Sequence, residues 1–143
     1  MVDDLFDDSG HLPAVTRSID LDAATDVVWE AVADPDQRAS WLDDEDATSR
    51  VLRIDAVDHG RSLTWTWWEP EDAGSASRVE IELIELATGG TRLVVTEQPV
   101  LRGGAGLRAQ ASAAAAAWDR RLLGLELLLL TVGAYALAGA SVF

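Results

Sequence analysis

The sequence contains no cysteine and no lysine, and these absences exclude several classes of protein. A chain without cysteine forms no disulfide, no thiolate zinc site and no thiol nucleophile. All 11 basic residues are arginine, and 25 acidic residues give a formal net charge of −14. Such a surface repels the phosphate backbone, so we expect no nucleic-acid partner. A GC-rich genome explains the missing lysine more simply than a high-salt host, although the excess of aspartate fits both.

Residues with chemical reactivity are also scarce. The two histidines, His11 and His59, are far apart in the chain and lack neighbouring ligands for a metal. No phosphate-binding loop or nucleophile elbow is present. Glu80 and Glu82 share one strand face, a spacing that is compatible with general acid–base catalysis. A face exposed to solvent explains them more simply. We therefore predict no catalytic residue, no metal and no cofactor.

The chain length of 143 residues suits a single domain with a buried core. Residues 1–14 are acidic and lack the apolar segment of a secretory signal, so we expect a flexible tail and a cytoplasmic protein. The domain itself is predicted over residues 15–130, followed by an apolar extension over residues 131–143.

The first part of this domain predicts one strand and two short helices. Residues 15–21 alternate in polarity, as in a half-buried strand. Thr25 is a suitable helix cap, and Val28 and Val32 form an apolar face after it. Pro35 disfavours helical geometry at the preceding residue, so a second short helix is expected to follow and to end near Trp41. The charged run 43–46 predicts a loop.

Four further strands are predicted, over residues 50–57, 62–69, 79–86 and 91–97. Turns at His59–Gly60 and Gly89–Gly90, and a polar loop over residues 70–77, separate them. This succession indicates an antiparallel meander. A change in the apolar phase at Leu83–Ile84 predicts a bulge.

A long helix is predicted from residue 107 to about residue 130. It contains five consecutive alanines, at 113–117, which favour helix. One apolar stripe runs along it at helical spacing: Trp118, Leu122, Leu125, Leu129 and Val132. This stripe is expected to cover one face of the sheet.

The chain resembles the START-like (SRPBCC, helix-grip) superfamily, and specifically the branch of activator of heat-shock-protein ATPase homologues. Four local matches carry the resemblance: the helix and Asp-Pro turn within residues 24–41, the strand RSLTWTWW at 61–68, the turn GGTRL at 89–93, and Trp118 followed by Leu122 and Leu125. The resemblance implies an α+β fold in which a curved antiparallel sheet packs on a long C-terminal helix around an apolar cavity. Only about eight residues separate Leu42 from Val51, so we expect about five strands, with one family hairpin missing.

The last 17 residues, 127–143, carry no charge. This length is at the lower limit for a membrane-spanning helix, and many of the residues are small, so a membrane anchor is the weaker interpretation. A segment that docks on the domain or mediates a homodimer is the stronger one.

We predict a non-enzymatic domain that binds a hydrophobic or lipid-like small molecule between sheet and helix. The expected ligand-contacting residues are Trp65, Trp67, Ile81, Leu83, Val95, Ala114, Trp118 and Leu122. Alternation places Trp65 and Trp67 on the inner face of their strand and Trp68 on the other face. Core packing alone is an equally good explanation for Trp65 and Trp67. Two alternatives remain: a co-chaperone-like protein-interaction module, and an enzyme resembling polyketide cyclases or aromatases.

Overall fold

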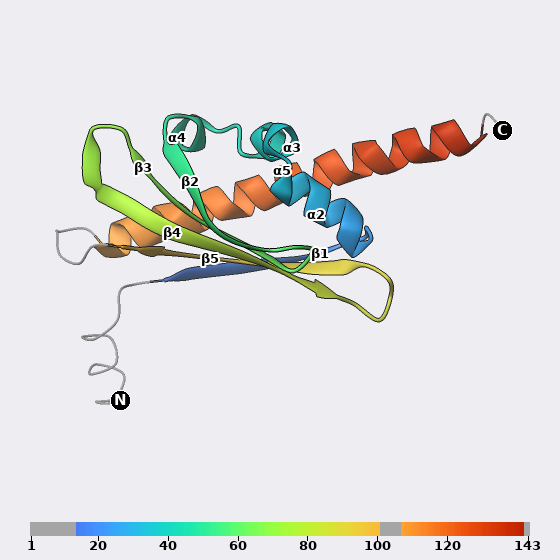
Figure 1. Ribbon diagram of the computed structural model, residues 1–143, viewed down its shortest axis with the longest axis horizontal. Coiled ribbons are helices and arrows are strands. Elements are labelled where there is room, and N and C mark those ends of the chain that lie inside the picture. Colours follow the sequence, from blue (N-terminus) through green and yellow to red (C-terminus); the bar gives the residue numbers. More distant parts are fainter. Residues whose placement is uncertain (1–13, 101–106, 142–143) are drawn as a thin grey trace.

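The computed structural model describes residues 14–100 and 107–141, with the side chains of 73, 107–111 and 132–141 excepted. Five strands and four helices follow one another in this part of the chain (Figure 1). Their order is β1 (Val15–Leu21), α2 (Thr25–Ala33), α3 (Pro35–Trp41), α4 (Glu45–Thr48), β2 (Val51–Asp58), β3 (Ser62–Glu69), β4 (Asp72–Glu85), β5 (Thr91–Pro99) and α5 (Leu107–Ser141).

The strands form one antiparallel sheet in the order β1-β5-β4-β3-β2. The predicted meander of β2 to β5 is confirmed, and β1 joins it beside β5. Directly opposed residues share a face, so the register sets Trp65 beside Val79 and Ile81 beside Val95. Glu80 and Glu82 fall on the other face and are exposed, as predicted. The α+β fold with a five-stranded sheet is therefore confirmed.

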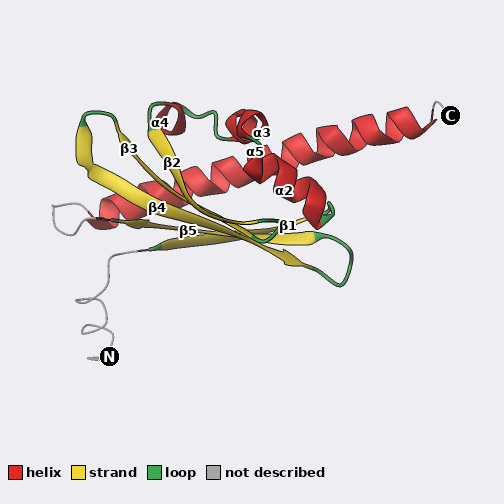
Figure 2. Ribbon diagram, viewed as in Figure 1, coloured by secondary structure: helices red, strands yellow, loops and turns green. Residues whose placement is uncertain are grey.

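The apolar stripe of α5 is buried against the sheet, as its spacing predicted. Trp118, Leu122, Leu125 and Leu129 are each at most 7% exposed, whereas the Val132 side chain lies outside the described part. The helix continues to Ser141, well beyond the predicted end, and extends past the sheet (Figure 2). At about 1.5 Å per residue it is about 52 Å long, more than an eight-residue strand can cover. No helix of the described chain is both long and apolar enough to cross a membrane.

Two predicted loops are instead regular structure. Residues 45–48 form the single-turn helix α4, whose first free N–H groups are capped by the Asp44 carboxylate accepting from Ala47 N. The predicted loop 70–77 shrinks because β4 begins at Asp72. Its polar residues pair with the end of β3, which the sequence pattern alone could not indicate.

Two details of the predicted strands and helices also differ. Pairing of β4 with β5 is regular through Leu83 and Ile84, so no bulge lies there, and the side chain of Ile84 is simply exposed. The register instead shifts between Ile54 and Ala56. Thr25 is the first residue of α2 rather than its cap, and its hydroxyl contacts that of Thr91.

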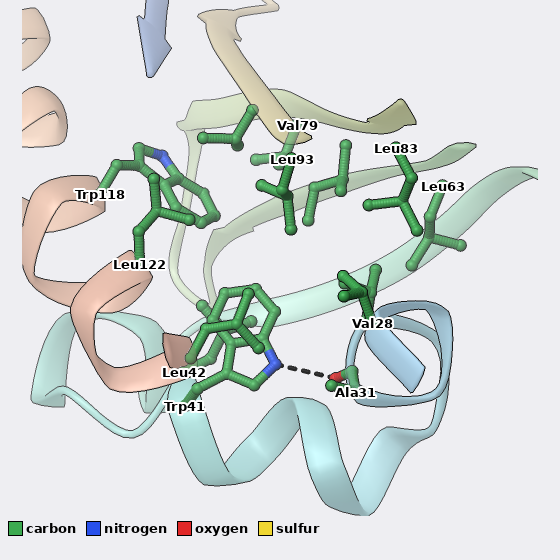
Figure 3. Close-up of a cluster of buried hydrophobic side chains, with 14 of the residues drawn as sticks. Val28, Ala31, Trp41, Leu42, Leu63, Val79, Leu83, Leu93, Trp118 and Leu122 are labelled. Atoms are coloured by element: carbon green, nitrogen blue, oxygen red, sulfur yellow. Dashed lines mark hydrogen bonds between the residues drawn. The ribbon is translucent and has the colours of Figure 1, made fainter. Parts of the chain in front are cut away.

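Helices α2 and α3 add side chains to the core, among them Val28 and Ala31 from α2 and Trp41 from α3 (Figure 3). Val28 and Val32 are fully buried in the same cluster as the apolar face of the sheet. The Trp41 indole donates to Ala31 O over 2.8 Å, which ties α3 to α2. The two helices therefore pack together as one unit next to α5.

Candidate functional site

The predicted ligand-contacting residues meet at the interface between the sheet and α5. Seven of them are buried in one cluster, and Ala114 packs against that cluster while half-buried. They come from the four elements β3 (Trp65, Trp67), β4 (Ile81, Leu83), β5 (Val95) and α5 (Ala114, Trp118, Leu122). The structure brings the predicted set together, and their contact with a ligand stays a prediction.

The tryptophan rings dominate this interface. Trp67 stacks on Trp118 with ring centroids 6.1 Å apart, and Trp65 meets Trp67 edge-on at 5.6 Å. Trp41 reaches Trp118 from α3 at 6.4 Å. Trp68 is half-buried on the other face, as alternation along β3 predicted. Four indoles from three elements thus form one aromatic cluster.

One of these indoles differs from the others in its hydrogen bonding. The Trp65 N–H is enclosed and has no acceptor among the described residues. The N–H groups of Trp41, Trp67 and Trp118 all have acceptors. An enclosed donor without an acceptor costs about 1–3 kcal/mol, so Trp65 offers a free donor at the interface.

A buried carboxylate, Glu97, organises the polar end of the interface. Trp67 Nε1 donates to its Oε2 over 2.8 Å, and Trp118 Nε1 donates to its Oε1 over 2.7 Å. The hydroxyl of Ser77 and Nη1 of Arg50 also donate to Oε2. The sequence analysis missed this residue, although Glu97 continues the buried alternation of residues 91, 93 and 95 along β5.

The guanidinium of Arg121 lies over two of the tryptophan rings, 4.9 Å from the Trp118 centroid and 5.2 Å from that of Trp67. Its side chain is 3% exposed and donates two hydrogen bonds to Asp44, over 2.8 and 2.9 Å. These bonds are the main reason that the pKa of the Asp44 carboxyl is lowered. The acidic run that we predicted as a solvated loop therefore binds α5.

Arg50, the residue directly before β2, completes this polar cluster. Its guanidinium lies 4.6 Å from the Trp67 centroid and pairs with Asp46 over 2.9 Å. It also approaches Glu97 at 3.4 Å. The cluster fills one end of the interface with paired charges.

The edge strand β2 exposes apolar side chains next to the aromatic cluster. Ile54 lies opposite Trp65 and Val57 opposite Leu63, so both share the face that packs on the helices. Ile54 is 39% exposed and Val57 59%, whereas their partners are enclosed. Simple alternation from Ile54 would place Ala56 on this face, but the register shift after Ile54 brings Val57 there instead. An apolar strip thus runs from the aromatic cluster to an exposed rim.

The remaining polar candidates that the structure describes, His59, Glu80 and Glu82, are exposed. His59 is exposed and meets Trp29 edge-on at 5.4 Å, while His11 lies outside the described residues. Among the described side chains, no group of three or more His, Asp or Glu could hold a metal.

Comparison with known proteins agrees with this geometry. Residues 42–129 match the family model described as activator of Hsp90 ATPase homolog 1-like protein. The chain belongs to this family. The match covers α4, the whole of β2 to β5 and most of α5. Three of the four indoles of the aromatic cluster, those of Trp65, Trp67 and Trp118, therefore lie within the part that matches an Hsp90 ATPase activator homolog 1-like domain, and Trp41 directly precedes it. No protein with a curated description matches the sequence.

Solved structures share the fold of this Hsp90 ATPase activator homolog 1-like domain at low identity. Protein MLL2253 from Mesorhizobium loti is 18% identical, with 82% of this chain and 96% of that chain covered and a TM-score of 0.66. CalU16 from Micromonospora echinospora is 19% identical, with 83% and 85% covered and a TM-score of 0.63. The Aha1 dimer from Colwellia psychrerythraea is 13% identical, with 82% and 96% covered and a TM-score of 0.61. At these identities the likeness shows the fold alone.

Proposed function

We propose that this domain binds a hydrophobic small molecule at the interface of the sheet with its helices, without catalysing a reaction. The observation that carries the proposal is the apolar strip that leads from the exposed rim of Ile54 and Val57 to the enclosed Trp65 and Leu63. Exposed apolar surface that is continuous with an enclosed aromatic cluster is typical of ligand sites. A ligand enters at the rim and reaches Trp65 first.

The energetics favour an apolar ligand. Each methylene removed from water contributes about 0.8 kcal/mol, and the rim residues lose exposed surface as well. The free N–H of Trp65 supplies one polar contact that orients the molecule. A site for a small molecule is typically lined by apolar side chains with only a few polar groups.

The buried carboxylate supports binding rather than catalysis. A general base needs a free oxygen lone pair within reach of the substrate. Glu97 already accepts hydrogen bonds from two indoles, a hydroxyl and a guanidinium. Its role is to hold the sheet and α5 together beside the ligand.

The test uses dodecanol, an uncharged probe, and the intrinsic tryptophan fluorescence. We expect dodecanol to change the emission in a saturable way and Val57→Asp to weaken its binding at least fivefold. Ile84→Asp is the matched control, because Ile84 is 42% exposed on the opposite face of the sheet. Absence of saturable binding to the wild-type protein would refute the proposal, and so would equal weakening by both variants.

A second candidate function is self-association through α5, in the class of protein-interaction modules. Leu123, Leu127 and Leu130 recur at helical spacing and are 58, 65 and 61% exposed. They lie opposite the buried stripe, on a helix that extends past the sheet (Figure 1). A second copy is the favoured partner, because the uncharged run from residue 127 avoids the repulsion between two chains of net charge −14. The Colwellia relative is described as a dimer.

A further inference from the structure

Arg38 on α3 stands out among the arginines near the aromatic cluster. Arg50 and Arg121 both form ion pairs with carboxylates. Arg38 is half-buried and forms none with the described side chains. Its Nη1 donates to the carbonyl oxygens of Val32 and Ala33, over 3.1 and 3.3 Å. These two bonds hold the side chain in place, and no carboxylate of the described residues forms an ion pair with it.

Burial makes the charged form of the Arg38 guanidinium less favourable than it is in water. Partial removal from water lowers the pKa of Arg38, and the nearby charge of Asp34 only opposes that effect. A half-buried cation gains most from an anion that shares its desolvated environment. The planar fork of a guanidinium matches the two oxygens of a carboxylate.

The position of Arg38 connects it to the proposed ligand site. Its guanidinium carbon lies 5.9 Å from the centroid of the Trp65 ring. Trp65 carries the enclosed N–H that lacks an acceptor, and it pairs across the sheet with the exposed Ile54. A cation, a free donor and an apolar rim therefore meet at one tryptophan.

We infer that the ligand is an amphiphile with an aliphatic tail and a carboxylate head group, and that Arg38 binds the carboxylate. This inference rests on the proposed function, because it assigns the head group of a molecule whose tail occupies the apolar strip. The Trp65 N–H donates a second hydrogen bond to the same group. On a chain of net charge −14, an anion needs such a local cation to bind at all.

The test compares two probes that share a tail, dodecanoate and dodecanol, at about pH 8, where the carboxylate is ionised. We expect the wild-type protein to bind dodecanoate at least tenfold more tightly than dodecanol. Arg38→Gln removes this preference while dodecanol binding stays within twofold. Arg120→Gln is the matched control, because it deletes the same charge from an exposed position on α5 and keeps the preference. Isothermal titration calorimetry measures each affinity.

The outcomes separate this inference from the proposed function. If dodecanol binds and dodecanoate binds no better, the carboxylate assignment is overturned while hydrophobic binding stands. If Arg120→Gln abolishes the preference as Arg38→Gln does, a specific role of Arg38 is overturned. If neither probe binds, both proposals fail. If Arg38→Gln does not fold, the comparison of dodecanoate with dodecanol on the wild-type protein still tests the carboxylate assignment.

Discussion

The indole N–H of Trp118 donates to the carboxylate of Glu97 across the sheet–helix interface, with Nε1 and Oε1 2.7 Å apart. This bond joins the last helix to the last strand, and the same carboxylate accepts from Trp67 on β3. With the hydroxyl of Ser77 on β4, one buried acid therefore connects four elements, β3, β4, β5 and α5. Its surroundings supply the donors that a carboxylate needs when it leaves water.

Replacement of Glu97 by glutamine should destabilise the domain by about 2–4 kcal/mol, because an amide nitrogen cannot accept the donors that now converge on Oε2. Urea denaturation followed by tryptophan fluorescence measures the free energy of unfolding. Glu80→Gln is the control, since Glu80 is exposed on β4 and should change stability by less than about 0.5 kcal/mol. Equal stability of Glu97→Gln and the wild type would show that the carboxylate is dispensable for the fold.

Two tryptophan variants should separate ring packing from hydrogen bonding. Trp118→Phe and Trp65→Phe remove similar volume from fully buried positions, but only Trp118 has an acceptor for its N–H. We expect Trp118→Phe to be the less stable by about 1–3 kcal/mol. Thermal and urea unfolding of both variants provide the comparison. A less stable Trp65→Phe would contradict the assignment of its N–H as unpartnered.

The stability of the domain should depend on the ionisation of Asp44. Hydrogen bonds from Arg121 hold the pKa of this carboxyl below its ordinary value of 3.8. The stabilisation is thus fully present above that value and is lost as the pH falls through the lowered pKa. Because Asp44 is partly exposed, solvent screens some of the interaction.

Asp44→Asn should accordingly be less stable than the wild type at neutral pH, and its free energy of unfolding should fall less steeply as the pH is lowered below about 4. Urea midpoints across this range measure the effect. Glu82→Gln, an exposed acid on β4 with no ion pair among the described side chains, should follow the wild-type profile. If the free energy of unfolding of Asp44→Asn changed with pH as that of the wild type does, the ion pair of Asp44 with Arg121 would not contribute to acid stability.

A charge on the exposed face of α5 should abolish self-association if that face joins two copies. Leu127→Glu places a carboxylate at a position that is 65% exposed, so the fold should tolerate it. Sedimentation velocity should show a dimer for the wild type and a monomer for Leu127→Glu. Ile84→Glu, on the exposed face of the sheet, should leave the dimer intact. A monomeric wild type at high concentration would reject the second candidate function.

The periodicity of the sequence was enough to assign most of the core. Strands expose alternate residues and helices bury every third or fourth, so Trp65, Trp67, Trp118 and Leu122 could be placed on the buried side without coordinates. The same reasoning separated Trp68 from its neighbours. It failed at Ala56, because a register shift is set by pairing with the next strand and leaves no mark in the alternation.

The sequence by itself determined the order of the five strands and of helices α2, α3 and α5, most of the buried faces and the resemblance to the family, because these depend on short-range patterns. Only the tertiary structure decided what the buried polar groups do. Glu97 and Trp118 are 21 residues apart, and Asp44 and Arg121 are 77 apart. No local pattern encodes such pairs, since their contact depends on how the whole chain packs. The same holds for Arg38 and Trp65, which belong to different layers of the fold and meet only once those layers close.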